Sequence, residues 1–141
     1  MRKNKQILVD EGNGDCMRAC LTGMLDLPND PKLVPLSGAK DWWKTCQPFL
    51  KRFGMKLAYE QKACWREGYW MASVKSKNYG KGITHAIVMK GSKVIYDPST
   101  KKRYKTGDDM LGEGVVVGGF FLEVTDASKL HKLAQFQKSR S

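Results

Sequence analysis

Cys16 has the surroundings that a nucleophilic thiol needs. It follows the turn-forming stretch Glu11-Gly12-Asn13-Gly14-Asp15 and begins an apolar stretch that predicts a buried helix. The free N–H groups and the positive dipole end of a helix's first turn stabilise a thiolate. The same turn offers the backbone N–H of Cys16 to a developing oxyanion. A buried, inert thiol is the alternative, and we expect it for Cys20, one turn further along.

A thiol nucleophile also needs a base, and the chain has two histidines. His131 lies in a basic C-terminal stretch and is predicted to be solvated. His85 begins an apolar stretch that predicts a strand, and Asp97 ends the next predicted strand. If Lys90-Gly91-Ser92 between them is a three-residue loop, His85 and Asp97 lie on one face, where the carboxylate can orient the imidazole. A two-residue loop would place them on opposite faces. A structural role for a lone strand histidine is the alternative.

The helix that carries Cys16 is expected from about Asp15 to Leu27. Asp15 is a good N-cap, and Pro28 ends the helix because proline disfavours a helical residue before it. The predicted polar stripe is narrow, and all other positions are apolar or small, so this is a central helix.

A second helix is expected from about Ala39 to Phe53, with Gly54 as its C-terminal cap. Its apolar face includes Cys46, which is predicted to be core. Pro48 conflicts with a helix interior, so we expect a kink or break near Lys44 to Gln47.

The rest of the chain turns to strand patterns. Five strands are predicted, at Met55–Tyr59, Tyr69–Val74, Thr84–Met89, Val94–Asp97 and Val115–Val124. Gly118-Gly119 in the last strand suggests a bulge or close packing. Helices followed by an antiparallel sheet predict an α+β fold, with a catalytic domain over residues 1–125 and a basic C-terminal helix or tail over 126–141.

The order and spacing of several short motifs resemble those of a known family. Gly14-Asp15-Cys16 opens a helix, Leu27-Pro28 and Val34-Pro35 follow, and His85-Ala86-Ile87-Val88 and Asp97-Pro98 come later. This pattern is similar to small papain-like cysteine proteins of phages and bacteria, related to the bacteriocin-leader peptidases. The resemblance covers roughly residues 6 to 98. It implies a papain-like fold and a Cys-His-Asp triad made of Cys16, His85 and Asp97.

The resemblance also implies the rest of the machinery. Gln6 takes the place of the glutamine that helps to form the oxyanion hole, whereas an aspartate at the nearer position, Asp10, would oppose an oxyanion. The implied activity is hydrolysis of a peptide, isopeptide or amide bond through a thioester, with a host protein as substrate if a phage encodes the chain. Transfer to an amine would use the same residues. Trp65, Tyr69 and Trp70 could line a substrate groove, although such aromatic residues are more often core.

The chain of 141 residues has a formal net charge of +11, which favours acidic partners. We expect an acidic protein or peptide substrate. A catalytically silent module that docks an acidic protein or nucleic acid through basic loops such as Lys101-Lys102-Arg103 is the second hypothesis. A plain nucleic-acid binder rests on charge alone and ranks last.

Cofactors and metals are not expected. The four cysteines lack the paired spacing of zinc sites and are predicted to be thiols. No apolar run is long enough to cross a membrane, and Ile7-Leu8-Val9 is too short for a secretory signal. We therefore expect a cytoplasmic protein.

Overall fold

The computed structural model describes residues 1–5, 16–32, 42–61, 67–75, 84–98 and 116–140 of the chain. The helices in these ranges are α1 (Cys16–Met24), α2 (Trp42–Lys51) and α4 (Leu130–Ser139), the last preceded by a 3-10 turn, η1 (Ala127–Lys129). The strands are β1 (Met55–Glu60), β2 (Tyr69–Lys75), β3 (Thr84–Lys90), β4 (Lys93–Tyr96) and β5 (Val116–Val124). The α+β class is confirmed, and each predicted strand lies within one residue of an observed one at both ends.

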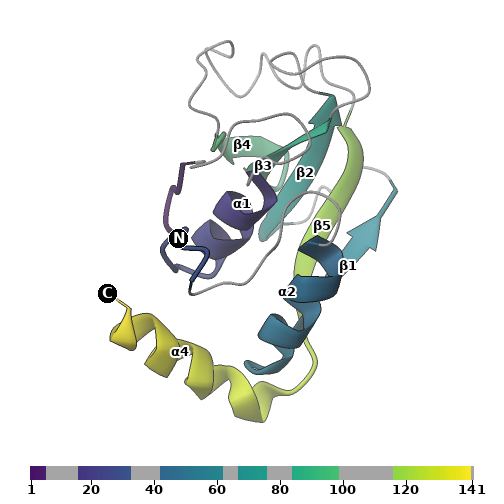
Figure 1. Cartoon of the computed structure of the whole chain (residues 1–141). Helices are drawn as coiled ribbons and strands as arrows, with labels where there is room; N and C mark the ends of the chain where they lie inside the picture. The colour runs from purple at the N-terminus through teal and green to yellow at the C-terminus, as the bar shows by residue number, and fades with distance from the viewer. Residues whose placement is uncertain (6–15, 33–41, 62–66, 76–83, 99–115, 141) are drawn as a thin grey trace.

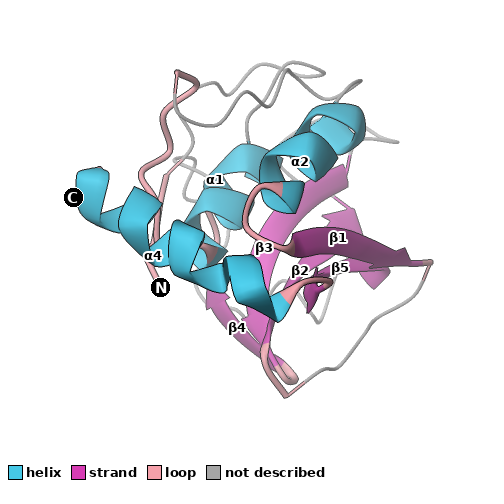
Figure 2. Ribbon diagram, turned by 90° about the horizontal axis from the view of Figure 1, so that it is seen from below, coloured by secondary structure: helices cyan, strands magenta, loops and turns pink. Residues whose placement is uncertain are grey.

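The five strands form one antiparallel sheet in the order β1-β5-β2-β3-β4. The helices gather on one side of this sheet (Figures 1 and 2). Helix α1 packs against β2 and β3, and α2 packs against β1. The helix that carries Cys16 therefore packs on β2, the central strand of the sheet, and on β3, the strand that carries His85.

The main core fills the space between helices and sheet. It joins Leu21 of α1 and Leu50 of α2 to Leu57, Met71 and Val88 of three strands, all at most 1% exposed. Because successive strand residues point to opposite faces, the alternate positions form a second cluster on the other face. Its members are Trp70, Ala72, Val74, Ile87, Met89 and Phe121.

Helix α1 ends three residues earlier than predicted, at Met24 rather than Leu27. The N–H of Leu27 donates to the carbonyl of Thr22 at 2.8 Å, and that of Asp26 donates to Gly23 at 3.1 Å. With Asp26 at φ 57°, these bonds form a Schellman motif. The turn at Asp26 ends the helix before Pro28 can do so. The predicted start at Asp15 lies outside the described residues.

The polar stripe of α1 faces the N-terminal segment rather than water. Arg18 is 6% exposed and Thr22 is fully buried. Asn4 donates its side-chain amide to Thr22 Oγ1 at 2.8 Å, and the N–H of Arg2 donates to the carbonyl of Gly23 at 2.9 Å. Residues 1–5 thus run beside α1 and bond to Thr22 and Gly23, whereas Arg18 donates to Oδ1 of Asn29 at 2.7 Å (Figure 1). The extended segment predicted from Gln6 lies outside the described residues.

Helix α2 continues through Pro48, so the break predicted as one of two outcomes near Lys44 to Gln47 does not occur. Gly54 ends it as predicted, with φ 71° and its N–H donating to the carbonyl of Lys51 at 3.1 Å. Gln47 of α2 bonds to both the carbonyl and the N–H of Leu57, at 2.8 and 3.1 Å. These bonds tie the helix to β1 next to the proline.

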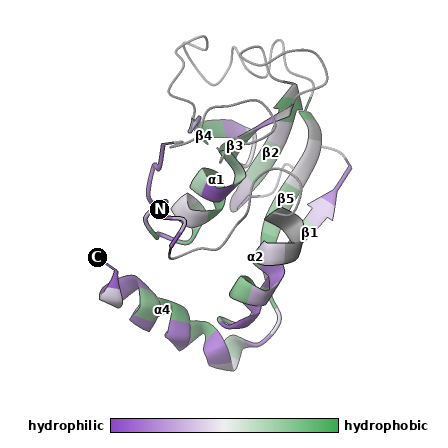
Figure 3. Ribbon diagram, viewed as in Figure 1, coloured by the Kyte–Doolittle hydropathy of each residue, from purple (hydrophilic) through white to green (hydrophobic). Residues whose placement is uncertain are grey.

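The C-terminal segment forms a helix up to Ser139. Asp126 caps η1 by accepting from the N–H of Ser128 at 3.1 Å. Phe136 of α4 contacts Phe49 and Phe53, with ring centroids 6.0 and 5.4 Å apart. Figure 3 shows hydrophobic and hydrophilic residues alternating along α4. None of the helices in the described ranges is long and apolar enough to cross a membrane.

Strand β5 carries the irregularity that the two glycines suggest. Ser73 of β2 pairs with Gly118, but the next residue, Val74, pairs with Val116. One residue of β5 is therefore extra, which is a β-bulge. Gly118 is also closely packed, because a Cβ there would lie 2.8 Å from the ring of Tyr59. Both predicted features are present.

Candidate active site

Cys16 stands at the beginning of α1 with a half-buried side chain and a free thiol. The backbone N–H groups of a helix's first turn have no partner within the helix. They point toward the space before the helix, together with the positive end of the helix dipole.

His85 is the second residue of β3, and its side chain is almost fully buried, with the residue 2% exposed. Asp97 follows the end of β4, and 21% of its side chain is exposed. The Nε2 atom of His85 lies 2.5 Å from Oδ1 of Asp97, within hydrogen-bonding distance. This bond fixes the orientation of the imidazole ring and leaves Nδ1 as the nitrogen that can face another group.

The turn that joins β3 to β4 differs from the prediction. Lys90 pairs with Lys93, so the loop has two residues, Gly91 and Ser92, rather than three. Gly91 has φ 59°, and glycine with positive φ at the first central position is typical of a type II′ hairpin. A regular ladder from this turn would place Asp97 on the face opposite to His85.

A β-bulge reverses that outcome. Met89 pairs with Val94, but the preceding residue, Val88, pairs with Tyr96, so Ile95 is extra. Beyond the bulge, Asp97 comes opposite Ile87, which shares its face of β3 with His85. The three-residue loop is therefore wrong, yet His85 and Asp97 still share a face and lie diagonally across the two strands.

Cys16 also interacts with His85. Burial lowers the pKa of His85, but the hydrogen bond to Asp97, the proximity of Cys16 and the charges of both groups outweigh burial and raise it to about 9. Since Nε2 bonds to Asp97, Nδ1 is the nitrogen that remains for the sulfur, and among the described residues no hydrogen bond reaches this buried atom. Asp97 thus bonds to His85 directly, whereas Cys16 acts on it through its nearby charge.

Two further residues tie the end of β4 to its neighbours, and neither was predicted. Tyr96 donates its hydroxyl to the carbonyl of Ala19 in α1 at 3.1 Å, which ties the end of β4 to the helix that carries Cys16. Lys5 donates its ammonium to the carbonyl of Asp97 at 3.2 Å. The position of Tyr96 beside Asp97 was visible in the sequence, but nothing there indicated its partner.

The other cysteines in the described part of the chain are structural. Cys20 and Cys46 are fully buried free thiols, as predicted. Burial raises the pKa of Cys46 to about 12, which keeps it a thiol. Cys64 lies outside the described residues.

The structure describes only some of the remaining predicted site residues. Gln6 and Trp65 lie outside the described residues. Trp70 is fully buried in the core cluster on the second face of the sheet, and its indole N–H donates to the carbonyl of Gly91 at 2.9 Å. Tyr69 is 40% exposed and pairs with Lys90, at the end of β3 away from His85. Trp70 is thus a core residue, and neither aromatic residue lines a groove at His85.

No group of three or more His, Cys, Asp or Glu side chains in the described ranges could hold a metal ion.

Neither a protein-family model nor a curated protein sequence matches this chain. Fold class alone does not define an activity, because one architecture carries many unrelated ones. What the site can do must therefore be inferred from its residues and their geometry.

Proposed function

We propose that this protein is a papain-like cysteine hydrolase that cleaves an amide bond with Cys16 as nucleophile. One observation carries the proposal: His85 bonds to a carboxylate through one nitrogen and interacts with the Cys16 thiol. A nucleophile, a base and a group that orients the base are the three parts that such catalysis needs.

The first half-reaction is acylation. The Cys16 thiolate attacks the carbonyl carbon, and the electron pair of the carbonyl moves to its oxygen. The N–H of Cys16 and, by resemblance, Gln6 would stabilise this oxyanion. As the tetrahedral intermediate collapses, the C–N bond breaks and the imidazolium of His85 gives its proton to the leaving amine. The product is a thioester on Cys16.

The second half-reaction releases the acid. Neutral His85 takes a proton from water, the hydroxide oxygen attacks the thioester, and the C–S bond breaks to restore the thiolate. Asp97 keeps the ring oriented and stabilises its charged form throughout. An amine in place of water would give acyl transfer with the same residues.

The arrangement of elements supports the papain-like part of the proposal. A central helix begins at the nucleophile and packs on an antiparallel sheet whose third strand carries the base. The net charge of +11 favours an acidic peptide or protein substrate, such as a host protein if a phage encodes the chain.

The proposal is tested by covalent trapping with a peptidyl vinyl sulfone, which reacts with activated thiolates. We expect a single adduct, located on Cys16 by mass spectrometry. The His85→Ala variant should lose it, because the thiolate loses its counter-charge. Cys20 in the same chain is the control for indiscriminate labelling. Circular dichroism spectra of both proteins check that the fold is retained.

An adduct that forms equally well in His85→Ala would contradict a catalytic pair. A folded protein whose Cys16 never reacts would favour the binding module instead. In that case the fold would serve only as a scaffold for an acidic partner.

A further inference from the structure

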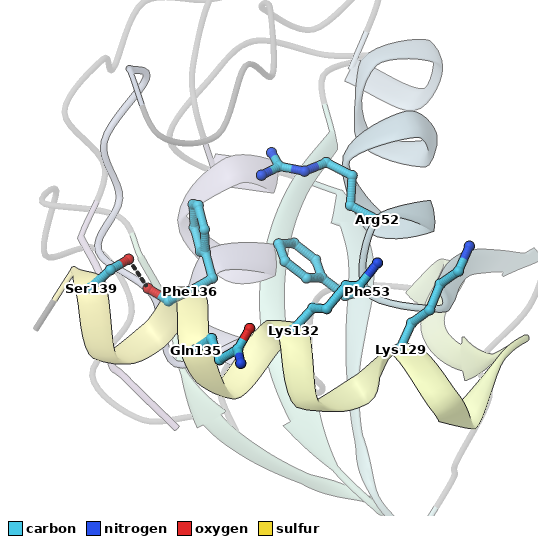
Figure 4. A pocket seen from close by; sticks show the side chains of 7 residues that line it. All are labelled: Arg52, Phe53, Lys129, Lys132, Gln135, Phe136 and Ser139. Atoms are coloured by element: carbon cyan, nitrogen blue, oxygen red, sulfur yellow. Dashed lines mark hydrogen bonds between the residues drawn. The ribbon is translucent and has the colours of Figure 1, made fainter.

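A groove lies between α4 and the end of α2, far from the candidate triad. Its volume is about 530 Å³. Figure 4 shows its lining, which consists of Arg52, Phe53, Lys129, Lys132, Gln135, Phe136 and Ser139.

The charge of this groove has one sign. Three lining residues, Arg52, Lys129 and Lys132, are cations, and none is a carboxylate. Asp126, the nearest described acid in sequence, bonds instead to the hydroxyl and N–H of Ser128, at 2.6 and 3.1 Å. Among the described residues no ion pair involves the three cations. The pKa of Asp126 is lowered by the hydrogen bonds from Ser128 and also by the charges of Lys129 and Lys132, so this one carboxylate offsets part of their charge. Three cations against one nearby carboxylate still leave a positive charge for an anionic ligand.

Arg52 is held in place by aromatic rings. Its guanidinium carbon lies 5.7, 5.4 and 5.5 Å from the ring centroids of Phe49, Phe53 and Phe136. These cation–π contacts orient a side chain that is otherwise exposed, and an oriented guanidinium loses less entropy when it binds a carboxylate. In Figure 4 the guanidinium extends above Phe53 and Phe136.

The length of the groove limits the size of its ligand. Lys129, Lys132, Phe136 and Ser139 lie along one face of the C-terminal helical segment. Ten residues at about 1.5 Å each span about 15 Å, which equals four or five residues of extended peptide. The hydroxyl of Ser139 and the amide of Gln135 add hydrogen-bonding groups to the positive charge.

We propose that this groove binds a short acidic peptide segment, rich in Asp or Glu, of a partner protein. Carboxylates would pair with Arg52, Lys129 and Lys132. A nucleic acid is the less suitable ligand, because single strands bind by stacking bases on open aromatic faces. The ring of Phe136 is already contacted by Arg52 and Arg140, at 5.5 and 5.3 Å, and by two phenylalanine rings.

The groove is separate from Cys16. Helix α4 joins the far end of the α1 segment, where Gln137 donates to the carbonyl of Leu25 at 2.6 Å, whereas Cys16 begins α1. Nine helical residues separate the two ends by roughly 13 Å. Peptide binding here does not depend on a working thiol, so this inference stands apart from the proposed hydrolase.

The test is a fluorescence anisotropy titration of the full chain with a labelled hexaglutamate peptide at physiological salt. The double variant Lys129→Glu and Lys132→Glu reverses the groove's charge. Its glutamates lie near a helix N-terminus, where the dipole favours them, so the fold should survive. The matched control, Lys3→Glu and Lys93→Glu, changes two exposed lysines elsewhere and alters net charge equally. A labelled six-nucleotide single-stranded DNA is the second ligand.

We expect the groove variant to weaken peptide binding by at least about tenfold, and the control variant to change it less than about twofold. Equal losses in both variants would show attraction by net charge alone and would overturn the proposal. Absence of peptide binding, or tighter binding of the DNA with the same dependence on the groove, would also overturn it.

Discussion

His85 and Asp97 are joined at 2.5 Å between Nε2 and Oδ1, and a bulge at Ile95 makes that contact possible. Cys16, in the first turn of α1, is close enough for its charge to help raise the pKa of the same imidazole. Because the three residues come from the end of β4, from β3 and from α1, their geometry depends on how the hairpin and the helix are held together. Each contact in that support can be changed separately.

The carboxylate of Asp97 should control the charge of His85. Asp97→Asn keeps the shape of the side chain but removes its charge. Burial, which lowers the pKa of His85, is then opposed less strongly, so this pKa should fall well below about 9. NMR titration of the imidazole measures this pKa directly. Asp126→Asn removes a carboxylate elsewhere and should leave it unchanged. An unchanged value in Asp97→Asn would show that the bond contributes little.

Because of the bulge, β4 should tolerate the deletion of one residue without losing the contact between His85 and Asp97. Deleting Ile95 removes the extra residue and leaves Val88 opposite Tyr96, so Asp97 should still meet His85. Deleting Val94 and Ile95 together shifts the ladder by one more residue and turns Asp97 to the other face. The pKa of His85 should therefore stay near 9 after the single deletion and fall after the double deletion. If the single deletion alone abolished the contact, the register given for β4 would be wrong.

Stability should depend on the pH through His85. Its pKa is raised from 6.5 to about 9 in the folded state. The folded state therefore binds the proton more tightly, and this contribution is complete below pH 6.5 and lost as the pH rises through 9. It amounts to about 3 kcal/mol of unfolding free energy. Urea unfolding at pH 6, 8 and 10 measures the loss.

The matched variant for this measurement is His85→Gln, which should show a shallower decline over the same pH window. Parallel curves for the two proteins would mean that other groups cause the pH dependence.

The contact between α1 and β4 is tested at Gly23. A Cβ at this position would lie 2.1 Å from the hydroxyl of Tyr96 and 2.4 Å from the carbonyl of Arg2. Gly23→Ala should therefore lower the unfolding free energy by about 1–3 kcal/mol through overpacking. Gly68→Ala, where a Cβ would meet nothing within 4 Å, should change it by less than about 0.5 kcal/mol. Similar effects of the two substitutions would rule out the close approach.

The strands were predictable because apolar residues, glycines and prolines mark their ends within one residue. The end of α1 was not, because Asp26 rather than a glycine adopts the left-handed conformation of the Schellman motif. Pro48 caused the opposite error, because it predicted an interruption of α2 where the helix continues. Gln47, next to the proline, bonds the helix to β1.

The candidate site, too, could be predicted only in part. The residue types and order of Cys16, His85 and Asp97 indicated chemistry, whereas the register that joins the last two could not be predicted. Val94, Ile95 and Tyr96 are all apolar or aromatic, so no alternation reveals which one is extra. Trp70 was open to both interpretations, and only its strand neighbours place it in the core.

The central claim is that His85 activates the Cys16 thiol. It is tested most directly by the rate at which iodoacetamide alkylates Cys16, followed by mass spectrometry from pH 5 to 10 in the native chain and in His85→Ala. We predict rapid alkylation at pH 6 in the native chain, at least about tenfold faster than in the variant, whose rate should rise only toward pH 8.5. Identical rate profiles in the two proteins would contradict the claim.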